Sequence, residues 1–559
     1  MTDGMKDGMT GASGRGAAAG MLGEPREGAV PRAPESAARG AGAASLVAAG
    51  ILFSRLSGFV RQRVFAHYFG TSDAGDVFSA ALRIPNLLQN LFGEGVLSAS
   101  FIPVYAALLG RGEREEAGRV AGVVAAALSV VVGVLVLVGV VATPWLIPLI
   151  APGFPAVKQA ETIRVVRILF PGVGLLVLSA WCLGILNSHR RFFLSYAAPV
   201  VWSAAMIAAM LAFGGGTPLY RLAAIVAVAA TVGSALQLAV QLPTVLRLVP
   251  RLRLSLDTRS AQVREIYRNF VPVVMARGVV QISAYVDGWL ASFLGTGAVV
   301  GFGYAQLLYT LPVSLFGMSV SASELPEMSR AQGDAAEVAA YLRRRLGSGL
   351  RRIAFLVVPS GVAFLALGDV LAGAVYQTGR FHHDDAVYVW AILAGSGVGL
   401  LASTLGRLYA STFYALRDTR TPLRFAVVRV ALTTGLGWFC ALVLPGLLGL
   451  DARWGAAGLT ASAGVAGWVE FLLLARGLGR RIGATALPVP FLARLWLAAG
   501  SAAALAWGAK LGAGAAGAAH PLLLGTLVCG LYGATYFAAT AALGLPEARA
   551  MLRRLPGFR

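Results

Sequence analysis

Apolar runs recur along most of the chain, separated by short polar segments, and each run is about 20 residues long, the length that spans a bilayer as a helix. Backbone polar groups inside a bilayer must bond within such a segment, so helices are the simplest solution. The composition agrees, because 57% of the residues are hydrophobic and only 13% are charged. We therefore predict an all-α polytopic membrane protein.

The apolar runs divide the chain into about fourteen transmembrane helices. We place them near 44–69, 76–107, 119–150, 161–186, 195–214, 220–244, 267–294, 299–328, 350–376, 386–415, 424–445, 455–475, 489–509 and 521–543. Residues 1–42 are rich in Gly, Ala, Pro and charge, which predicts a disordered cytoplasmic tail. We expect an N-lobe at 43–250 with six helices and a C-lobe core at 251–485 with six. Residues 486–559 hold the last two helices and a cytoplasmic C-terminal tail.

The basic residues indicate how the chain is oriented. Loops on one side of the predicted helices hold most of the arginines, and the loops on the other side hold Lys158, Arg380, Arg453 and Lys510. Arginine-rich loops stay in the cytoplasm, so both chain ends are expected there, in a bacterial inner membrane. The net charge of +21 is therefore a topology signal, and no nucleic-acid partner is predicted.

Motifs for catalysis or for a bound metal are missing from the sequence. Cys182, Cys440 and Cys529 lie far apart within apolar runs, and no G-x-x-x-x-G-K-[ST] loop occurs. The stretch His382–Asp385 falls in an outside loop without further ligands nearby, which favours a solvated loop over a metal site. We predict neither an enzyme nor a cofactor.

The second predicted helix carries a polar face at membrane depth. Asp76, Arg83, Asn90 and Glu94 share this face, together with positions 80 and 87. Pro85 is expected to bend the helix. Charges at this depth are costly, so the stripe predicts either a water-filled cavity or ion pairs with neighbouring helices.

Several predicted helices also carry arginine. The first has Arg55 and Arg61, and the seventh has Arg277 on a polar face, with Asp287 next to that face. The planar guanidinium suits phosphate and pyrophosphate, so these residues predict an anionic substrate. Snorkelling to the cytoplasmic interface is the alternative expected for Arg63, Arg268 and Arg424.

These residues lie within stretches that closely resemble the MurJ (MviN) family of lipid II flippases. The longest is SRLSGFVRQRVFAHYFGTSDAGDVFSAALRIPNLLQNLFGEGVLSASFIPVY at 54–105. The others, in chain order, are APGF (151–154), RILFP (167–171), LNSHRRF (186–192), QISAYVDGWLASFLGTGAVVGFGYA (281–305), LPEMSR (325–330), TGRF (378–381) and FYALRDTRTP (413–422). The resemblance is collinear over roughly residues 44–480, and its first and last stretches are the specific ones.

The resemblance implies a fold and an activity. Members of this family belong to a superfamily of polysaccharide and multidrug exporters, with two lobes around a central cationic cavity. Their substrate is lipid II, an undecaprenyl-pyrophosphate glycopeptide that is moved from the inner to the outer leaflet. The last two helices are thought to hold the lipid tail. Sodium or the membrane potential is linked to transport, so a coupling cation such as Na+ is expected here.

The resemblance also implies roles for single residues. Arg55 and Arg61 match the arginines of the first helix, and Asp76 and Glu94 match acids of the second. Arg83 stands where the family has a basic residue. We expect these residues and Arg277 to contact substrate, the acids pairing with arginines in one state and releasing them in another. Asp287, Thr433 and Thr434 are the candidates for a cation site.

Two positions depart from the family pattern. Gln89 and Leu307 stand where the family often has arginine. Lipid II remains the leading substrate, and the chain is expected to act as a monomer.

 The departures leave open a flippase for another polyprenyl-linked glycan, a cation-coupled exporter of the same superfamily, or a non-transporting scaffold for cell-wall enzymes.

Overall fold

The structure is a computed structural model that describes residues 34–515 and 520–552. Within these ranges, the side chains that remain outside the description are those of residues 34–48, 94, 276–284, 514–515, 550 and 552. Leu46–Arg559 form one compact unit, and the arrangement given below concerns this unit. The first helix begins at Pro34, earlier than the expected residue 44, and most of the predicted tail at 1–42 lies outside the described residues.

Helices account for the regular structure of the described residues, apart from an isolated bridge between Thr378 and Phe381. In the first part of the chain they are α1 (Pro34–Phe69), α2 (Asp73–Phe92), α3 (Glu94–Ser100), α4 (Ile102–Gly110), α5 (Arg114–Ile150), α6 (Ala156–Ser188), α7 (Phe192–Ala197), α8 (Pro199–Phe213) and α9 (Leu219–Leu248). The predicted all-α fold is confirmed for the described part of the chain.

The second part of the chain begins with a helix that follows the arginine-rich linker. Its elements are α10 (Ala261–Ala291), α11 (Ala298–Pro312), η1 (Val313–Met318), α12 (Ser319–Ser329), α13 (Ala335–Tyr376), α14 (His383–Ala415), α15 (Arg420–Trp438), η2 (Phe439–Val443), α16 (Leu444–Leu447), η3 (Ala452–Trp454), α17 (Gly455–Ile482), α18 (Val489–Ala515), α19 (Pro521–Ala542) and α20 (Pro546–Leu552). The elements η1 and η2 are π-helical turns that continue the helices beside them.

Twelve segments of the described residues are long and apolar enough to cross a membrane. Two further helices, α1 with 36 residues and α10 with 31, stand where the first and seventh spans were expected. Together these elements agree with the predicted total of about fourteen spans.

The second span differs in detail from the expectation. Pro85 lies inside α2, which continues to Phe92, and the chain then breaks at Gly93 and again at Phe101. A side chain at position 93 would collide with the Gln89 carbonyl oxygen at 2.2 Å, so the break requires glycine there. The expected single helix at 76–107 is therefore three consecutive helices.

The loop expected before the ninth span is helical as well. Helix α13 has 42 residues and begins at Ala335, where Asp334 and Glu337 form a capping box. At 1.5 Å per residue it is about 63 Å long, twice the hydrocarbon thickness of a bilayer. Its arginine-rich first turns therefore extend beyond the apolar region.

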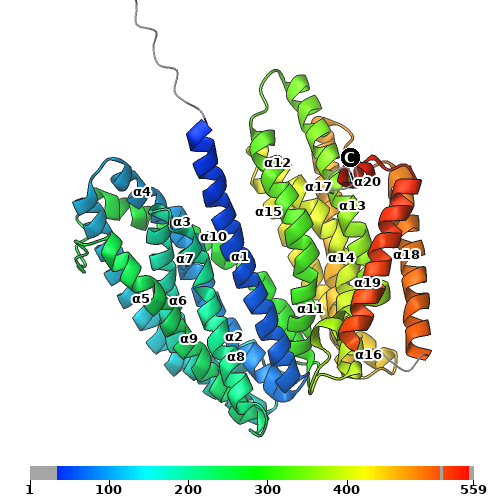
Figure 1. The fold of residues 1–559 in the computed structure, drawn as a ribbon, viewed down its shortest axis with the longest axis horizontal. Coiled ribbons are helices and arrows are strands. Elements are labelled where there is room, and N and C mark those ends of the chain that lie inside the picture. Colours follow the sequence, from blue (N-terminus) through cyan, green and yellow to red (C-terminus); the bar gives the residue numbers. More distant parts are fainter. Residues whose placement is uncertain (1–33, 516–519, 553–559) are drawn as a thin grey trace, which may run out of the picture. The chain divides into compact units, whose positions relative to one another are not determined.

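The helices pack as two groups within this unit (Figure 1). In the first, α6 contacts α2, α5 and α9, and α8 packs on α9. In the second, α14 contacts α11, α13 and α17, while α15 packs on α17. The first turns of α10 contribute Val263 and Ile266 to the apolar core of the first group, and its last turn contributes Leu290 to the core that reaches the second.

The last two helices, α18 and α19, pack against each other and against α13. Pro359 lacks an N–H group, so the Phe355 carbonyl loses its usual helical partner. The Tyr536 hydroxyl donates a hydrogen bond to this carbonyl at 2.6 Å, and the Tyr532 hydroxyl donates to the Pro359 carbonyl at 2.7 Å. We call these four residues the α13–α19 seam.

Two ion pairs also link the C-terminal helices to α13. Lys510 of α18 bonds to Asp369 near the end of α13, with 2.5 Å between Nζ and Oδ2. Arg351, in the middle part of α13, bonds to Glu547 of α20 at 2.7 Å, and its guanidinium lies 4.3 Å from the ring centre of Phe491 of α18. The C-terminal helices are thus fixed to α13 between Arg351 and Asp369.

Candidate functional site

A buried acidic group joins the two helix groups at the ends of α2, α6 and α11. The Asp76 side chain is fully buried, and its Oδ2 lies 2.6 Å from Lys158 Nζ. The backbone N–H groups of Gly297 and Val300, at the start of α11, donate to the same carboxylate at 2.7 and 2.8 Å. A negative charge at a helix N-terminus is favourable, and here it also has a lysine partner.

Asp73 enlarges this contact. Its Oδ1 accepts a hydrogen bond from Lys158 at 2.8 Å and another from the Thr296 hydroxyl at 2.9 Å. Gly297 has a φ of 82°, and a side chain there would lie 2.5 Å from the Thr71 carbonyl oxygen. Glycine is therefore required at this approach. We call the set Asp73, Asp76, Lys158, Thr296, Gly297 and Val300 the Asp76 junction.

A second group of polar contacts lies beside the junction and uses another of the short sequence motifs. Arg380 of the TGRF stretch donates its N–H to the His67 carbonyl at 2.8 Å, and His67 Nδ1 lies 2.7 Å from the Thr378 hydroxyl. The Tyr304 hydroxyl donates to the Gly70 carbonyl at 3.0 Å. These contacts join the end of α1 to α11 and to the turn after α13.

The partner of Asp76 in this structure differs from the expected one. It was expected to pair with arginines of the first helix, and its partner is instead Lys158, which is itself buried. The sequence placed Lys158 in an outside loop, whereas it belongs to the first turns of α6. One feature of the sequence could have pointed to Lys158. It is one of few lysines, and it lies on the outer side of the predicted topology, where basic residues are rare.

The two arginines of α1 differ in their surroundings. Arg61 is half-buried, with its guanidinium 4.5 Å from the ring centre of Trp202 on α8. Arg55 is exposed, and no hydrogen bond or ion pair of its side chain occurs within the described part of the chain. Arg63 does not snorkel as expected, because it donates to the Ala374 and Val375 carbonyls at the end of α13.

Arg83 lies between α2 and α10. A methyl group on Gly288 would overlap its guanidinium, with 1.1 Å to Nη1, so the absence of a side chain at 288 makes room for Arg83. The Tyr285 hydroxyl donates to the Arg83 carbonyl. Asp287 directly precedes Gly288, and its carboxylate is attracted by the positive charges of Arg83 and Arg429.

Asp287 keeps one carboxylate oxygen buried without a hydrogen-bond partner among the described residues. Arg429, on α15, forms an ion pair with Glu470 of α17 at 3.1 Å. Thr434 is exposed and donates its hydroxyl to the Val430 carbonyl, and no described contact joins Thr433 or Thr434 to Asp287. The expected cation site is therefore not assembled from these three residues.

Other predicted residues lie outside the site or outside the description. The side chains of Glu94 and Arg277 are outside the described residues. Asp385 accepts a hydrogen bond from the Thr71 hydroxyl and helps to cap α14. Within residues 34–515 and 520–552, no group of three or more His, Cys, Asp or Glu side chains could hold a metal ion.

Comparison with known proteins identifies relatives over most of the chain. Residues 65–526 match the family model described as "Lipid II flippase MurJ". The lipid II flippase MurJ of Burkholderia cenocepacia is 32% identical over 440 residues, which cover 77% of this chain and 82% of that protein. The probable lipid II flippase MurJ of Rhizobium tropici is 31% identical and covers 77% of this chain and 79% of its own.

Solved structures support the same fold. A lipid II flippase MurJ in an inward closed conformation has a TM-score of 0.71 at 21% identity, covering 89% of this chain and 98% of that one. An inward-facing MATE-family multidrug transporter of the MOP superfamily has a TM-score of 0.59 at 16% identity, covering 77% and 96%. The family-model match over residues 65–526 and the 32% identity to the Burkholderia cenocepacia protein place the chain in the lipid II flippase MurJ family.

Proposed function

We propose that this chain flips lipid II from the inner to the outer leaflet of the bacterial cytoplasmic membrane by alternating access. Family membership over residues 65–526 supports the substrate. The observation that carries the mechanism is the Asp76 junction, which joins the two helix groups through a charge that is buried and paired. In this proposal the junction closes the outer side, and both chain ends face the cytoplasm.

The pyrophosphate of the substrate would be bound by Arg55, Arg61 and Arg83, with Arg277 as a further donor. Arg55 is exposed and Arg61 is half-buried on Trp202, so both guanidinium groups leave donors for an anion. The polar head would cross in contact with these donors while the polyprenyl tail stays in lipid. Gln89 and Leu307, where the family often has arginine, make the remaining arginines more important.

Opening of the outer side requires the Asp76 junction to break. Its carboxylate loses a lysine and two backbone donors at that moment, so water must replace these donors. A substrate drives such a change only if it binds the open state more tightly than the closed one. In this proposal Asp76 and Glu94 exchange partners during the cycle.

The proposal involves transport without catalysis, and it needs neither a cofactor nor a second copy of the chain. A coupling cation such as Na+ would be held by Asp287, because one of its carboxylate oxygens is buried without a hydrogen-bond partner among the described residues. Thr433 and Thr434 would supply further oxygens only after a rearrangement of α15.

The test is complementation of a bacterium depleted of its own lipid II flippase. Expression of this chain is expected to restore growth and the accessibility of lipid II on the outer leaflet. Arg55→Ala is expected to abolish both at normal protein levels, because one positive donor is removed from the pyrophosphate site. Normal growth and accessibility with this variant would contradict the assignment, and Arg344→Ala, which changes an exposed arginine of α13, is the matched control.

A further inference from the structure

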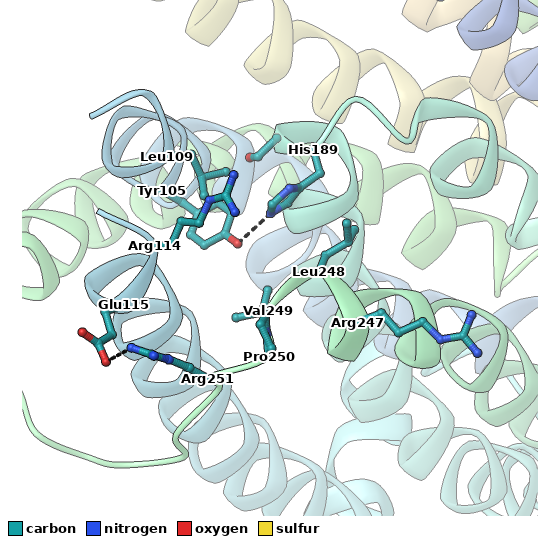
Figure 2. Close-up of a pocket in the computed structure, with 11 residues that line it drawn as sticks. Tyr105, Leu109, Arg114, Glu115, His189, Arg247, Leu248, Val249, Pro250 and Arg251 are labelled. Carbon is teal, nitrogen blue, oxygen red and sulfur yellow. Dashed lines mark hydrogen bonds and ion pairs between the residues drawn. The ribbon is translucent and has the colours of Figure 1, made fainter. Parts of the chain in front are cut away.

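A cavity of about 710 Å³ lies where the ends of α4, α6 and α9 meet the start of α5 (Figure 2). This volume is within the range of small-molecule sites. The cavity lies on the side of the arginine-rich loops, away from the Asp76 junction at the opposite end of α6. Its lining includes Tyr105, Arg114, Glu115, His189, Arg247 and Arg251.

The charges around the cavity are unbalanced. Arg251 forms an ion pair with Glu115, the only carboxylate among the lining residues. Burial and the nearby Arg114 lower the pKa of His189, so this histidine is neutral at pH 7. Arg114 and Arg247 therefore contribute two positive charges that no lining carboxylate balances.

These two arginines are not occupied by the ends of neighbouring helices. Cations near a helix C-terminus commonly bond its last carbonyl groups, and α4, α6 and α9 all end here. Within the described contacts, neither Arg114 nor Arg247 donates a side-chain hydrogen bond to those carbonyls or to any other group. Among the described residues, both guanidinium groups therefore keep donors for a ligand.

The wall beside Arg114 is held in place. The Tyr105 hydroxyl lies 3.0 Å from His189 Nε2, and the Tyr105 ring stacks on Phe101 with 5.2 Å between ring centres. Figure 2 shows Arg114 beside this pair and Arg247 on the other side of Val249. A fixed wall lowers the entropy cost of binding a ligand.

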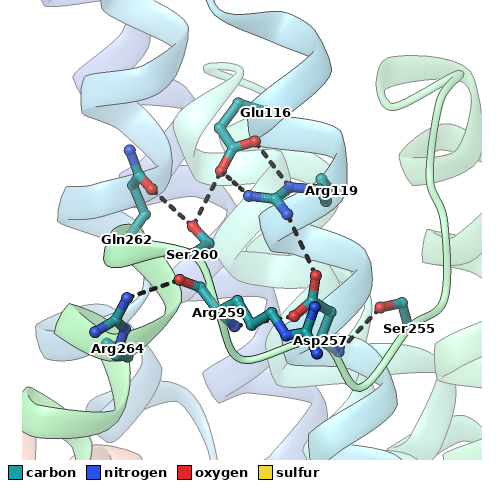
Figure 3. A network of polar contacts seen from close by, with 8 residues as sticks. All are labelled: Glu116, Arg119, Ser255, Asp257, Arg259, Ser260, Gln262 and Arg264. Carbon is teal, nitrogen blue, oxygen red and sulfur yellow. Dashed lines mark hydrogen bonds and ion pairs between the residues drawn. The ribbon is translucent and has the colours of Figure 1, made fainter.

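The linker that forms the remaining wall is fixed as well. A side chain on Gly122 of α5 would lie 2.1 Å from the Arg253 carbonyl oxygen, so the linker rests directly on the helix backbone. Glu116 accepts hydrogen bonds from Arg119 at 2.8 Å and from the Ser260 hydroxyl at 3.1 Å (Figure 3). Arg119 also reaches Asp257 at 3.7 Å.

We propose that this cavity binds a phosphate-bearing anion, either a soluble phosphate compound or the headgroup of an anionic lipid. Arginine forks bind phosphate oxygens in pairs. Arg114 offers one such fork beside the Tyr105–His189 pair, and Arg247 offers a second at the exposed rim, where Figure 2 shows its side chain directed away from Val249. The volume exceeds that of one inorganic phosphate, so a pyrophosphate or a phosphate ester fits better. The bound anion would link α5, α9 and the linker between the helix groups.

The test measures hydrogen–deuterium exchange of the full chain in nanodiscs, over residues 105–115 and 245–253. One arm adds inorganic pyrophosphate to phosphatidylcholine nanodiscs, and the other replaces part of the lipid by phosphatidylglycerol. We expect slower exchange in one arm, with binding weakened about tenfold or more by Arg114→Gln/Arg247→Gln. The matched control is Arg344→Gln/Arg420→Gln, which changes two exposed arginines elsewhere.

Each outcome decides the proposal. Protection by pyrophosphate identifies a soluble phosphate ligand, and protection only with phosphatidylglycerol identifies a lipid headgroup. No protection in either arm, or equal protection in the cavity variant, would overturn it. Arg55→Ala must keep the protection, which separates this cavity from the proposed lipid II site, and no arm depends on transport.

Discussion

The Asp76 junction and the α13–α19 seam both join helices that are far apart in the sequence, but they use different chemistry. The junction depends on a fully buried carboxylate with a lysine and two backbone N–H donors around it. The seam depends on two tyrosine hydroxyls that bond to carbonyls around Pro359, within apolar packing. Water can replace the lost partner of a charged group, whereas it cannot replace the contacts that apolar side chains lose.

This difference indicates which contact changes during transport. Breaking the junction exposes a carboxylate that water can solvate and a lysine that water or an anionic substrate can bind, so the open state is accessible. Breaking the seam would leave the Phe355 carbonyl without a partner inside the membrane, at a cost that lipid does not offset. We therefore expect the junction to open while the last two helices stay fixed to α13.

The largest effect is expected at the junction. Asp76→Asn removes the charge that balances the buried Lys158, and loss of one partner of a buried pair costs about 3–5 kcal/mol. The unfolding midpoint in detergent and the complementation assay should both fall steeply. Asp384→Asn, at an exposed aspartate in the first turn of α14, is the control.

A double variant sharpens this result. Asp76→Asn with Lys158→Met removes both charges, so part of the lost stability should return while transport stays low. If the single and double variants are equally unstable, the pairing with Lys158 does not explain the effect.

The seam should show a smaller effect of another kind. Tyr536→Phe leaves the Phe355 carbonyl without its donor, which costs about 1–3 kcal/mol. The unfolding midpoint should fall, whereas transport per folded molecule should stay near normal because the seam does not open. Tyr414→Phe, at an exposed tyrosine without described hydrogen bonds, is the control. A loss of transport at unchanged stability would show that the seam moves.

The ion pair at the end of α18 should contribute less. Lys510 is one-quarter exposed, so solvent screens its pairing with Asp369, and Lys510→Gln should cost about 1 kcal/mol. The measurement is again the unfolding midpoint, with Arg494→Gln on the same helix as control. An effect as large as that of Asp76→Asn would remove the contrast between this partly exposed ion pair and the buried Asp76 junction.

The smallest effect concerns pH. In the turn between α14 and α15, hydrogen bonds from Thr421, with Arg481 nearby, lower the pKa of Asp418. A lowered folded-state pKa stabilises the fold above the ordinary aspartate pKa, and this contribution is lost as pH falls through the lowered value. The difference in unfolding midpoint between the wild type and Asp418→Asn should stay constant from pH 8 to about 5 and shrink below about pH 4. A difference that grows on acidification would contradict this explanation.

Much of the fold was predictable because it depends on local pattern. Apolar runs of membrane length predicted the helices, and the positions of twelve described spans agree with those runs. The break at Gly93 was missed because a lone glycine is tolerated in helices. The collision that a side chain there would make with the Gln89 carbonyl depends on how the two helices meet. The helical start of α13 was missed because its arginines were counted as loop residues.

The candidate site was only partly predictable. The polar face of α2 correctly drew attention to Asp76 and Arg83, because charges in an apolar run are unusual. Their partners did not follow from that pattern: Lys158 comes from α6, and Gly288 and Asp287 from α10. The pairing of Arg63 with the end of α13 crosses more than 300 residues of sequence.

The sequence by itself determined that this chain enters a membrane as helices, which helices carry charge, and to which family it belongs. These properties depend on composition, on local spacing and on collinear motifs. The tertiary structure decided which charges meet, where a carboxylate is buried at the start of another helix, and which arginines remain free. The physical reason is that pairing energies depend on distance and burial, and only the packing of distant helices sets these.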